Sequence, residues 1–178
     1  MTEVIERIMF SEEDLKKRIH ELGEQISRDY EGKSPVFVGI LKGCFIFMAD
    51  LMRQVTVRCT VDFMAVSSYG NALSTTGAVK INKDLSQDIE GKHVILVEDI
   101  LDSGITLNYL TKYLKNRNPA SLAIVTLMDK PSRRIAPIQS DYCGFVVPDE
   151  FLLGYGMDFE EEYRNIPFLG ILKPEYYQ

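Results

Sequence analysis

HVILVEDILDSGITLNYL, residues 93–110, carries the strongest structural signal of the sequence. It opens with the apolar run Val94–Val97, which is short and continuous in the way typical of a strand covered on both faces in a parallel sheet. Two acids, Glu98 and Asp99, follow where we expect this strand to end. The polar turn Asp102–Gly104 then leads into apolar residues at helical spacing. The segment therefore predicts a strand, a tight polar turn and a helix in direct succession.

This arrangement suits a sugar phosphate. Backbone N–H groups at a helix N-terminus are unpaired and partly positive, so they can hold a phosphate, and the hydroxyls of Ser103 and Thr106 would add donors. Glu98 and Asp99 would repel that phosphate, but they can accept hydrogen bonds from sugar hydroxyls or bind them through Mg²⁺. We interpret the segment as a candidate ribose-phosphate site. The alternative is a buried strand, a solvated acidic turn and a capped helix without a ligand.

The rest of the chain alternates predicted helices and strands. A capping-box-like start at Ser11–Asp14 predicts a helix that runs to about Asp29. Further strands are predicted at residues 36–41, 60–66, 79–81, 121–128 and 142–147, a helix through residues 45–52, and a lid-like polar loop at residues 71–77. This alternation predicts an α/β fold with a parallel sheet, and ligands are expected outside the carboxyl ends of its strands.

Composition narrows the class of protein. A chain of 178 residues with 46% hydrophobic and 26% charged residues is expected to form one globular domain, residues 1–178. We find no apolar run long enough to span a bilayer and no signal-peptide pattern, and three scattered cysteines favour a reducing compartment, the cytoplasm. The net charge of −6 argues against broad nucleic-acid binding, which needs a basic face. A small anionic substrate is compatible with it.

VEDILDSGITL, residues 97–107, resembles the phosphoribosyl-pyrophosphate motif of the type I phosphoribosyltransferases. Hydrophobic residues, two acids, two hydrophobic residues, Asp, Ser-Gly and Thr stand in the family's order. The resemblance implies a mainly parallel twisted sheet flanked by helices, with a core at about residues 36–147. It also implies a small hood formed by N- and C-terminal segments, at about residues 1–15 and 148–178.

Within the motif, the resemblance implies a role for each position. The loop that holds the 5′-phosphate would comprise Asp102, Ser103, Gly104, Ile105 and Thr106, and Glu98 and Asp99 would hold the ribose hydroxyls directly or through Mg²⁺. Asp102 would also be the catalytic general base or acid at purine N7. Ile105 stands where some members carry Lys or a polar residue, and we expect little consequence because backbone N–H groups bind the phosphate.

Other stretches resemble one branch of the family, the hypoxanthine-guanine phosphoribosyltransferases of purine salvage. Leu41-Lys42-Gly43 resembles the pyrophosphate loop, in which the Leu-Lys peptide is typically cis; the sequence alone does not show the isomer. Ser68 and Tyr69 resemble the start of a mobile loop that closes over the site and excludes water. Without the resemblance, these would be an ordinary strand-helix turn and a polar hairpin tip.

Three residues match the branch's purine site. Lys130 falls where the branch has a lysine that donates to the 6-oxo oxygen of the base, and Phe151 and Leu152 match residues that stack on the base and hydrogen-bond it through backbone. Because an ammonium group has no acceptor, Lys130 would favour a 6-oxo over a 6-amino purine. Taken singly, Lys130 would be a solvated turn lysine and Phe151 a core residue.

MDFEEEYR, residues 157–164, holds the last match. Asp158 matches a Mg²⁺-binding acid, which together with Glu98 and Asp99 completes the implied metal site, and Arg164 matches an arginine that contacts pyrophosphate. For the intervening acids at 160–162 we predict a solvated helix face. We predict surface positions for Arg133 and Arg134.

The resemblance implies Mg²⁺-dependent transfer of the 5-phosphoribosyl group from phosphoribosyl pyrophosphate to N9 of hypoxanthine or guanine, giving IMP or GMP and pyrophosphate. Two alternatives stay open: a relative that prefers xanthine and guanine, and a regulator that binds nucleotides or RNA on the same fold. The acidic balance counts against RNA, and the intact Asp102 counts against a degenerate site. The family also implies a homo-oligomer, a dimer or tetramer, with no nucleic-acid or membrane partner.

Overall fold

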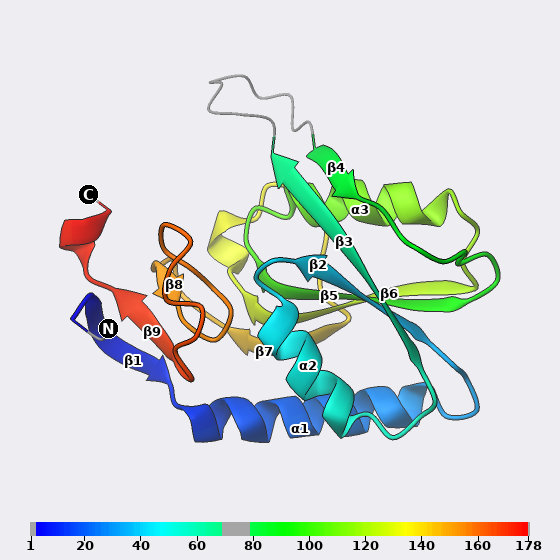
Figure 1. The fold of residues 1–178 in the computed structure, drawn as a ribbon, viewed down its shortest axis with the longest axis horizontal. Helices are drawn as coiled ribbons and strands as arrows, with labels where there is room; N and C mark the ends of the chain where they lie inside the picture. Colours follow the sequence, from blue (N-terminus) through cyan, green and yellow to red (C-terminus); the bar gives the residue numbers. More distant parts are fainter. Residues whose placement is uncertain (1–2, 69–78, 178) are drawn as a thin grey trace.

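The computed structural model describes residues 3–68 and 79–177, and the chain forms a six-stranded sheet in the order β4-β3-β2-β5-β6-β7 (Figure 1). Neighbouring strands are parallel except for the pair β3–β4. The elements of this layer are α1 (Glu12–Asp29), β2 (Val36–Leu41), α2 (Phe45–Gln54), β3 (Thr60–Ser68), β4 (Val79–Lys83), β5 (His93–Leu101), α3 (Ile105–Lys115), β6 (Ser121–Asp129) and β7 (Tyr142–Val146). The predicted α/β class is thereby confirmed, whereas the predicted loop at 71–77 and Tyr69 lie outside the described residues.

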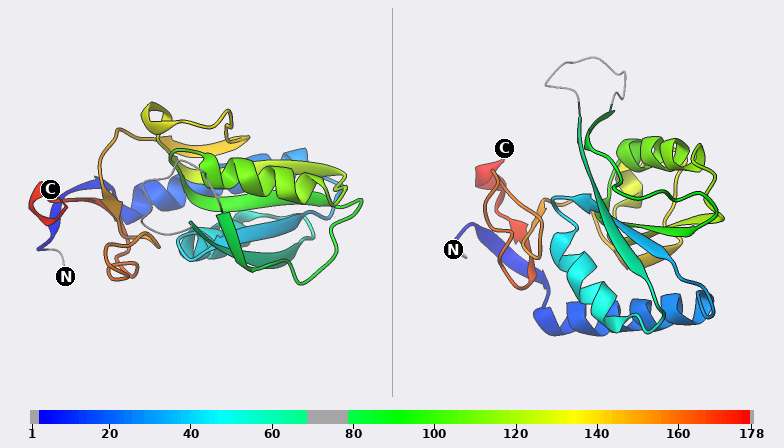
Figure 2. Two further views of the ribbon diagram at one scale, coloured as in Figure 1. Left: turned by 90° about the horizontal axis from the view of Figure 1, so that it is seen from above. Right: turned by 45° about the vertical axis from the view of Figure 1, so that its right-hand side comes forward.

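The helices cover both faces of the sheet. In Figures 1 and 2, α1 and α2 lie together on one side of it and α3 lies on the other. Strand β5 divides its side chains accordingly: Ile95 and Val97 belong to the core under α1 and α2, whereas Val94 and Leu96 belong to the core under α3. Burial on both faces explains why this strand is a continuous apolar run.

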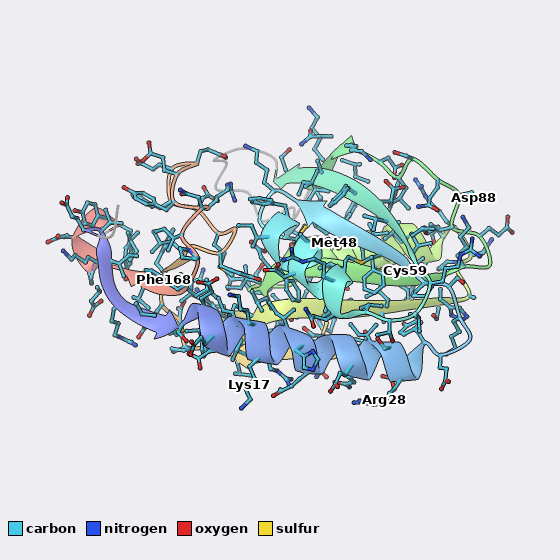
Figure 3. The ribbon with its side chains drawn as sticks, turned by 60° about the horizontal axis from the view of Figure 1, so that its bottom comes forward. Lys17, Arg28, Met48, Cys59, Asp88 and Phe168 are labelled. Carbon is cyan, nitrogen blue, oxygen red and sulfur yellow. The ribbon has the colours of Figure 1, made fainter. Side chains whose placement is uncertain are left out.

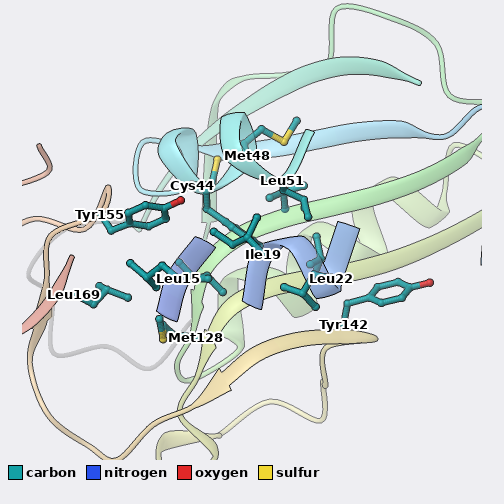
Figure 4. Packing of buried hydrophobic residues seen from close by; sticks show 14 of the residues in the cluster. Leu15, Ile19, Leu22, Cys44, Met48, Leu51, Met128, Tyr142, Tyr155 and Leu169 are labelled. Atoms are coloured by element: carbon teal, nitrogen blue, oxygen red, sulfur yellow. The ribbon is translucent and has the colours of Figure 1, made fainter. Parts of the chain in front are cut away.

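Helix α1 follows its sequence signals closely. Ser11 caps its N-terminus, and a capping box joins Ser11 to Asp14. Leu15, Ile19 and Leu22 are fully buried or nearly so against α2 and the sheet (Figure 4). Charged residues such as Lys17 and Arg28, labelled in Figure 3, lie on the outer side of the helix. The apolar inner face and the charged outer face together fix the orientation of α1 on the sheet.

A second, smaller sheet joins the two ends of the chain. It consists of β1 (Ile5–Phe10), β9 (Leu169–Leu172) and β8 (Leu152–Leu153), all antiparallel, and lies at one end of the main sheet (Figure 1). This arrangement agrees with the predicted hood of N- and C-terminal segments; its exact boundaries stay a prediction. Among the described residues, no helix has both the length and the apolarity that a membrane crossing requires.

The sequence predicted that β5 ends where Glu98 and Asp99 begin, and this prediction is wrong. The strand continues to Leu101, because β6 offers partners beyond the point where β2 stops: Val97 is the last residue paired with β2, whereas Glu98 pairs with Thr126 and Leu101 with Asp129. The acids therefore lie on a rigid strand end held from one side, rather than in a loop.

A buried carboxylate connects β3 to the segment before β5. Asp62 is 6% exposed and accepts hydrogen bonds from the backbone N–H groups of Phe63, Ser86 and Gln87 and from the Lys83 ammonium group. Burial favours the neutral acid, but these donors outweigh it and lower the pKa of Asp62. The carboxylate should therefore stabilise the fold above the ordinary pKa of 3.8, and this contribution should be lost as the pH falls through the lowered value.

We accordingly expect Asp62→Asn to lower the free energy of unfolding by about 2–3 kcal/mol at pH 7, because an amide cannot accept all of these bonds. Urea unfolding at pH 7 and pH 3 measures the difference, which should shrink at the lower pH. Asp88→Asn, at an exposed position, is the control and should change little. A pH-independent loss in Asp62→Asn would contradict the role of the charge.

Candidate active site

A cavity of about 490 Å³ lies beyond the carboxyl ends of β5 and β6, where it meets the second sheet. Its walls are formed by Asp99, Ile100, Asp102, Lys130, Arg133, Asp149, Glu150, Phe151, Leu152, Met157, Asp158 and Tyr177. The structure thus brings together six residues that were predicted from separate stretches of sequence: Asp99, Asp102, Lys130, Phe151, Leu152 and Asp158. Its position agrees with the rule that parallel sheets bind ligands at the carboxyl ends of their strands.

A second, smaller cavity of about 90 Å³ shares Ile100 and Asp102 with the first. Its walls are formed by Glu98, Ile100, Leu101, Asp102, Ser103, Gly104, Thr106 and Leu107. This is the predicted phosphate loop, and it ends at the first turn of the 11-residue helix α3. Free N–H groups of such a turn, together with the hydroxyls of Ser103 and Thr106, make this small cavity suitable for an anion.

The turn depends on Gly104 and on local hydrogen bonding. Gly104 has φ +78°, a left-handed conformation, and a Cβ atom there would lie 2.6 Å from Cγ2 of Ile138. The N–H of Ile105 points to Oγ of Ser103 at 3.4 Å. The Ile105 side chain lines neither cavity, so its contribution is limited to the backbone.

Two arginines hold the phosphate loop from outside. Arg134 donates to the backbone oxygens of Leu101 and Asp102 and pairs with Asp129. Its side chain is only 17% exposed, so the predicted surface position is wrong for Arg134, because loop carbonyls and a carboxylate surround its guanidinium group. Arg133 is half exposed, as predicted, yet its Nε lies 2.9 Å from Oδ1 of Asp102.

The two acids at the end of β5 are strongly perturbed. Burial raises the pKa of Asp99 to about 6, and the nearby Asp158 adds to the rise. Burial and the charge of Asp99 raise the pKa of Glu98 well above its ordinary range. Gly43 makes room for Asp99, because a Cβ atom on Gly43 would lie 1.7 Å from Oδ2 of Asp99. A crowded pair of partly buried carboxyl groups is a suitable place for a cation or for sugar hydroxyls.

The peptide bond between Leu41 and Lys42 is cis, as the resemblance had led us to expect for this loop. Gly43 also lies against Gly156, where a Cβ atom would lie 2.3 Å from the Gly43 carbonyl oxygen. Lys42 and Gly43 line neither cavity, but Gly43 lies directly against Asp99.

The acidic segment 157–164 is not a helix. It forms turns, with Phe159 and Glu162 paired in an isolated bridge and Glu161 at φ +68°. The predicted helix is therefore wrong for residues 160–162, whereas their predicted solvent exposure is confirmed. Glu161 also pairs with Nζ of Lys42 at 2.7 Å. The predicted helix does not form because the segment doubles back on itself.

Arg164 organises this acidic segment. Its guanidinium group lies 2.7 Å from Oδ1 of Asp158 and donates to the backbone oxygen of Gly156. It also lies 3.3 Å from Oε2 of Glu161, so one carboxylate bridges Lys42 and Arg164. The two cations assigned to pyrophosphate from the sequence are thereby brought to one place.

The donor set fits Mg²⁺. Asp99 and Asp158 line the same cavity with carboxylate oxygens, the ligand type that Mg²⁺ prefers. Residues 3–68 and 79–177 contain no group of three or more acids, histidines or cysteines placed to hold a metal by themselves. Mg²⁺ is commonly held by one or two carboxylates together with substrate phosphates, so this sparse set suits an ion that enters with a phosphorylated substrate.

Lys130 faces the cavity from the end of β6. It is 8% exposed, and its Nζ donates to the backbone oxygen of Glu150 at 2.6 Å and lies 3.9 Å from Asp149. Burial lowers the pKa of Lys130, against the opposing charges of Asp102 and Asp149. This is a fixed, largely buried donor, not the solvated turn lysine that its local sequence suggests.

Phe151 and Leu152 also line the larger cavity. The backbone oxygen of Phe151 accepts from the N–H of Leu172, which ties it to β9, and Leu152 begins β8. Phe159 packs edge-on against the Phe151 ring, with centroids 5.8 Å apart. Of the predicted lid residues, Ser68 ends β3, where it pairs with Val79, and Tyr69 lies outside the described part of the chain.

Several cavity residues were missed in the sequence. Arg133, Asp149, Glu150, Met157 and Tyr177 line the larger cavity. For Arg133 and Asp149 the local sequence carries no signal that separates them from surface residues. Tyr177 follows Phe151 by a long stretch of chain, and only the pairing of β8 with β9 brings the end of the chain back to it.

Comparison with known proteins decides the family. A model of the phosphoribosyl transferase domain matches residues 10–160. The chain belongs to the phosphoribosyltransferase family. A hypoxanthine-guanine phosphoribosyltransferase of Bacillus subtilis is 47% identical over 174 residues, which cover 98% of this chain and 97% of that protein. The crystal structure of a hypoxanthine phosphoribosyltransferase from Staphylococcus aureus superposes with a TM-score of 0.95 at 48% identity, covering 98% of this chain and 95% of that one.

The bifunctional protein TilS/HprT of Listeria monocytogenes is 50% identical over 173 residues. The match covers 97% of this chain, but the chain spans only 27% of the length of that relative. The resemblance to the phosphoribosyltransferase family that the motif indicated is confirmed, together with its fold.

Proposed function

We propose that the protein transfers the 5-phosphoribosyl group of phosphoribosyl pyrophosphate to N9 of hypoxanthine or guanine, which yields IMP or GMP and pyrophosphate. One observation carries this proposal. A buried lysine, Lys130, and an aromatic ring, Phe151, lie in the same cavity as the acids Asp99 and Asp102, and Asp102 also lines the adjoining small cavity at the N-terminus of α3. The cavity therefore offers a base subsite and a sugar-phosphate subsite side by side. The names of the relatives support the same reaction.

The small cavity would bind the 5′-phosphate. Backbone N–H groups of the loop from Asp102 to Thr106 and the hydroxyl of Ser103 would donate to it. Arg134 keeps this loop in place by donating to the backbone oxygen of Asp102. Glu98 and Asp99 would accept hydrogen bonds from the ribose hydroxyls through their carboxylate oxygens.

Pyrophosphate would lie beside Gly43. Lys42 and Arg164, the two cations assigned to it, are both paired with Glu161. The Lys42–Glu161 pair is 66% exposed on each side, and such pairs contribute little to stability, so a phosphate can replace Glu161 at low cost. Mg²⁺, held by Asp99 and Asp158, would neutralise charge on the leaving pyrophosphate.

The base would bind between Lys130 and Phe151. Nζ of Lys130 would donate to the 6-oxo oxygen, Phe151 would stack on the ring, and backbone at Leu152 would hydrogen-bond its edge. The carboxylate of Asp102, which lies between the base and the phosphate loop, would exchange a proton with N7 and stabilise positive charge that develops on the purine. We further propose that the protein acts in the cytoplasm as a homo-oligomer without nucleic acid.

Parallel assays with four bases test the function. Protein, phosphoribosyl pyrophosphate and Mg²⁺ are incubated with hypoxanthine, guanine, xanthine or adenine, and nucleotide formation is measured. We expect nucleotide from hypoxanthine and guanine but not from adenine, because Lys130 has no acceptor for a 6-amino group. The xanthine reaction distinguishes a xanthine/guanine-preferring enzyme. Well-folded protein that makes nucleotide from none of the four would overturn the proposal.

A further inference from the structure

The last turn of the chain returns to the base subsite. Tyr177 lines the larger cavity together with Lys130 and Phe151. Its ring stacks on that of Phe151, with centroids 5.4 Å apart and planes inclined by 30°. Aromatic rings prefer such offset stacking, so each ring restricts the orientation of the other.

Three backbone hydrogen bonds donated by residues of the segment 172–177 hold Tyr177 in this position. The N–H of Tyr177 donates to the Pro174 carbonyl oxygen at 3.1 Å, which closes the terminal turn. Lys173 donates to the carbonyl of Val4, and Leu172 donates to the carbonyl of Phe151. This segment is therefore attached both to Val4, which directly precedes β1, and to Phe151, whose ring Tyr177 contacts.

The cavity retains about 490 Å³ with Tyr177 in place, a volume in the usual range for small-molecule sites. Tyr177 is thus a wall of the cavity and does not fill it. Phe159 packs edge-on against Phe151 and belongs with it to the small apolar cluster under the second sheet. Phe151 therefore has aromatic neighbours on two sides, one in the core and one at the cavity.

We propose that Tyr177 is a positioning residue for purine binding, which fixes the Phe151 ring as a platform and completes the aromatic wall of the base subsite. This inference rests on the proposed function and extends it to a residue outside the motifs. Because Tyr177 lines the larger cavity and not the smaller one, its effect should fall on the base and spare phosphoribosyl pyrophosphate.

Steady-state kinetics of Tyr177→Ala test this inference. We expect the KM for hypoxanthine to rise roughly three- to tenfold, the range for loss of one aromatic stacking contact, with the KM for phosphoribosyl pyrophosphate changed less than about twofold. Tyr177→Phe keeps the ring and should remain near the wild-type value. Tyr176→Ala is a matched control, since Tyr176 is the neighbouring residue, is 42% exposed against 43% for Tyr177, and lines neither cavity.

Each outcome is decisive. An unchanged or lower KM for hypoxanthine in Tyr177→Ala, or an equal rise in both KM values, overturns the inference while the wild-type enzyme remains active. Should the wild-type protein make no nucleotide, titration with GMP replaces the kinetics, and Tyr177→Ala should weaken binding by the same factor. Wild-type protein that neither makes nucleotide nor binds GMP overturns both the proposed function and the role of Tyr177. Thermal unfolding of all variants separates a local effect from loss of the fold.

Discussion

Asp102→Asn is expected to lower kcat by about 100- to 10,000-fold, the range for loss of a positioned general acid or base. An amide has the shape of the carboxylate but can neither take up a proton at neutral pH nor balance positive charge on the purine ring. The backbone of residue 102 is held by Arg134, so the substitution should leave the phosphate loop in place. We therefore expect the KM for phosphoribosyl pyrophosphate to change much less than kcat.

The control for this experiment is Asp149→Asn. Asp149 is a second carboxylate of the same cavity, is 52% exposed, and also approaches Arg133, yet we assign it no chemical role. Single-turnover measurements with saturating hypoxanthine report the chemical step directly. Folded Asp102→Asn protein with a turnover close to that of the wild type would remove Asp102 from the mechanism.

The elements of the fold were predictable from the sequence where residues close together in the chain determine them. The run at the start of β5 is apolar on both faces because helices cover both faces of the sheet. The start of α1 is set by the capping box between Ser11 and Asp14, which are only three residues apart in the sequence. The end of β5 was not predictable in this way. Its length depends on β6, which continues to pair as far as Asp129, and a partner strand is not visible in the local sequence.

In the candidate site, too, features set by neighbouring residues were predictable and features set by distant segments were not. The phosphate loop is contiguous, so its order of residues was sufficient to predict its place at the start of α3. The position of Arg134 was misjudged because loop carbonyls from a distant segment surround its guanidinium group. The pairing of Glu161 with Lys42 was not predicted because the two residues are far apart in the sequence. Tyr177 was missed for the same reason, since only tertiary pairing brings it to Phe151.

Lys130→Met is expected to reduce kcat/KM for hypoxanthine by on the order of 100-fold, the cost of removing a charged donor from a buried acceptor. Methionine fills a similar volume without a donor, so the 6-oxo oxygen of the base would be desolvated and left unpaired. Adenine should gain little, but the preference for hypoxanthine over adenine should narrow, because Lys130 is the group proposed to distinguish the two. Kinetics with both bases measure this ratio.

Stability separates the chemical role of Lys130 from a structural one. Burial lowers its pKa, which shows that the cavity disfavours the ammonium charge, whereas its bond to the Glu150 carbonyl holds the wall of the cavity. These effects oppose each other, so Lys130→Met should unfold within about 1 kcal/mol of the wild type. Lys92→Met, at an exposed position, should alter neither kinetics nor stability. A variant with full activity toward hypoxanthine would show that Lys130 supports the wall alone, and recognition of the 6-oxo group would then have to come from backbone at Leu152.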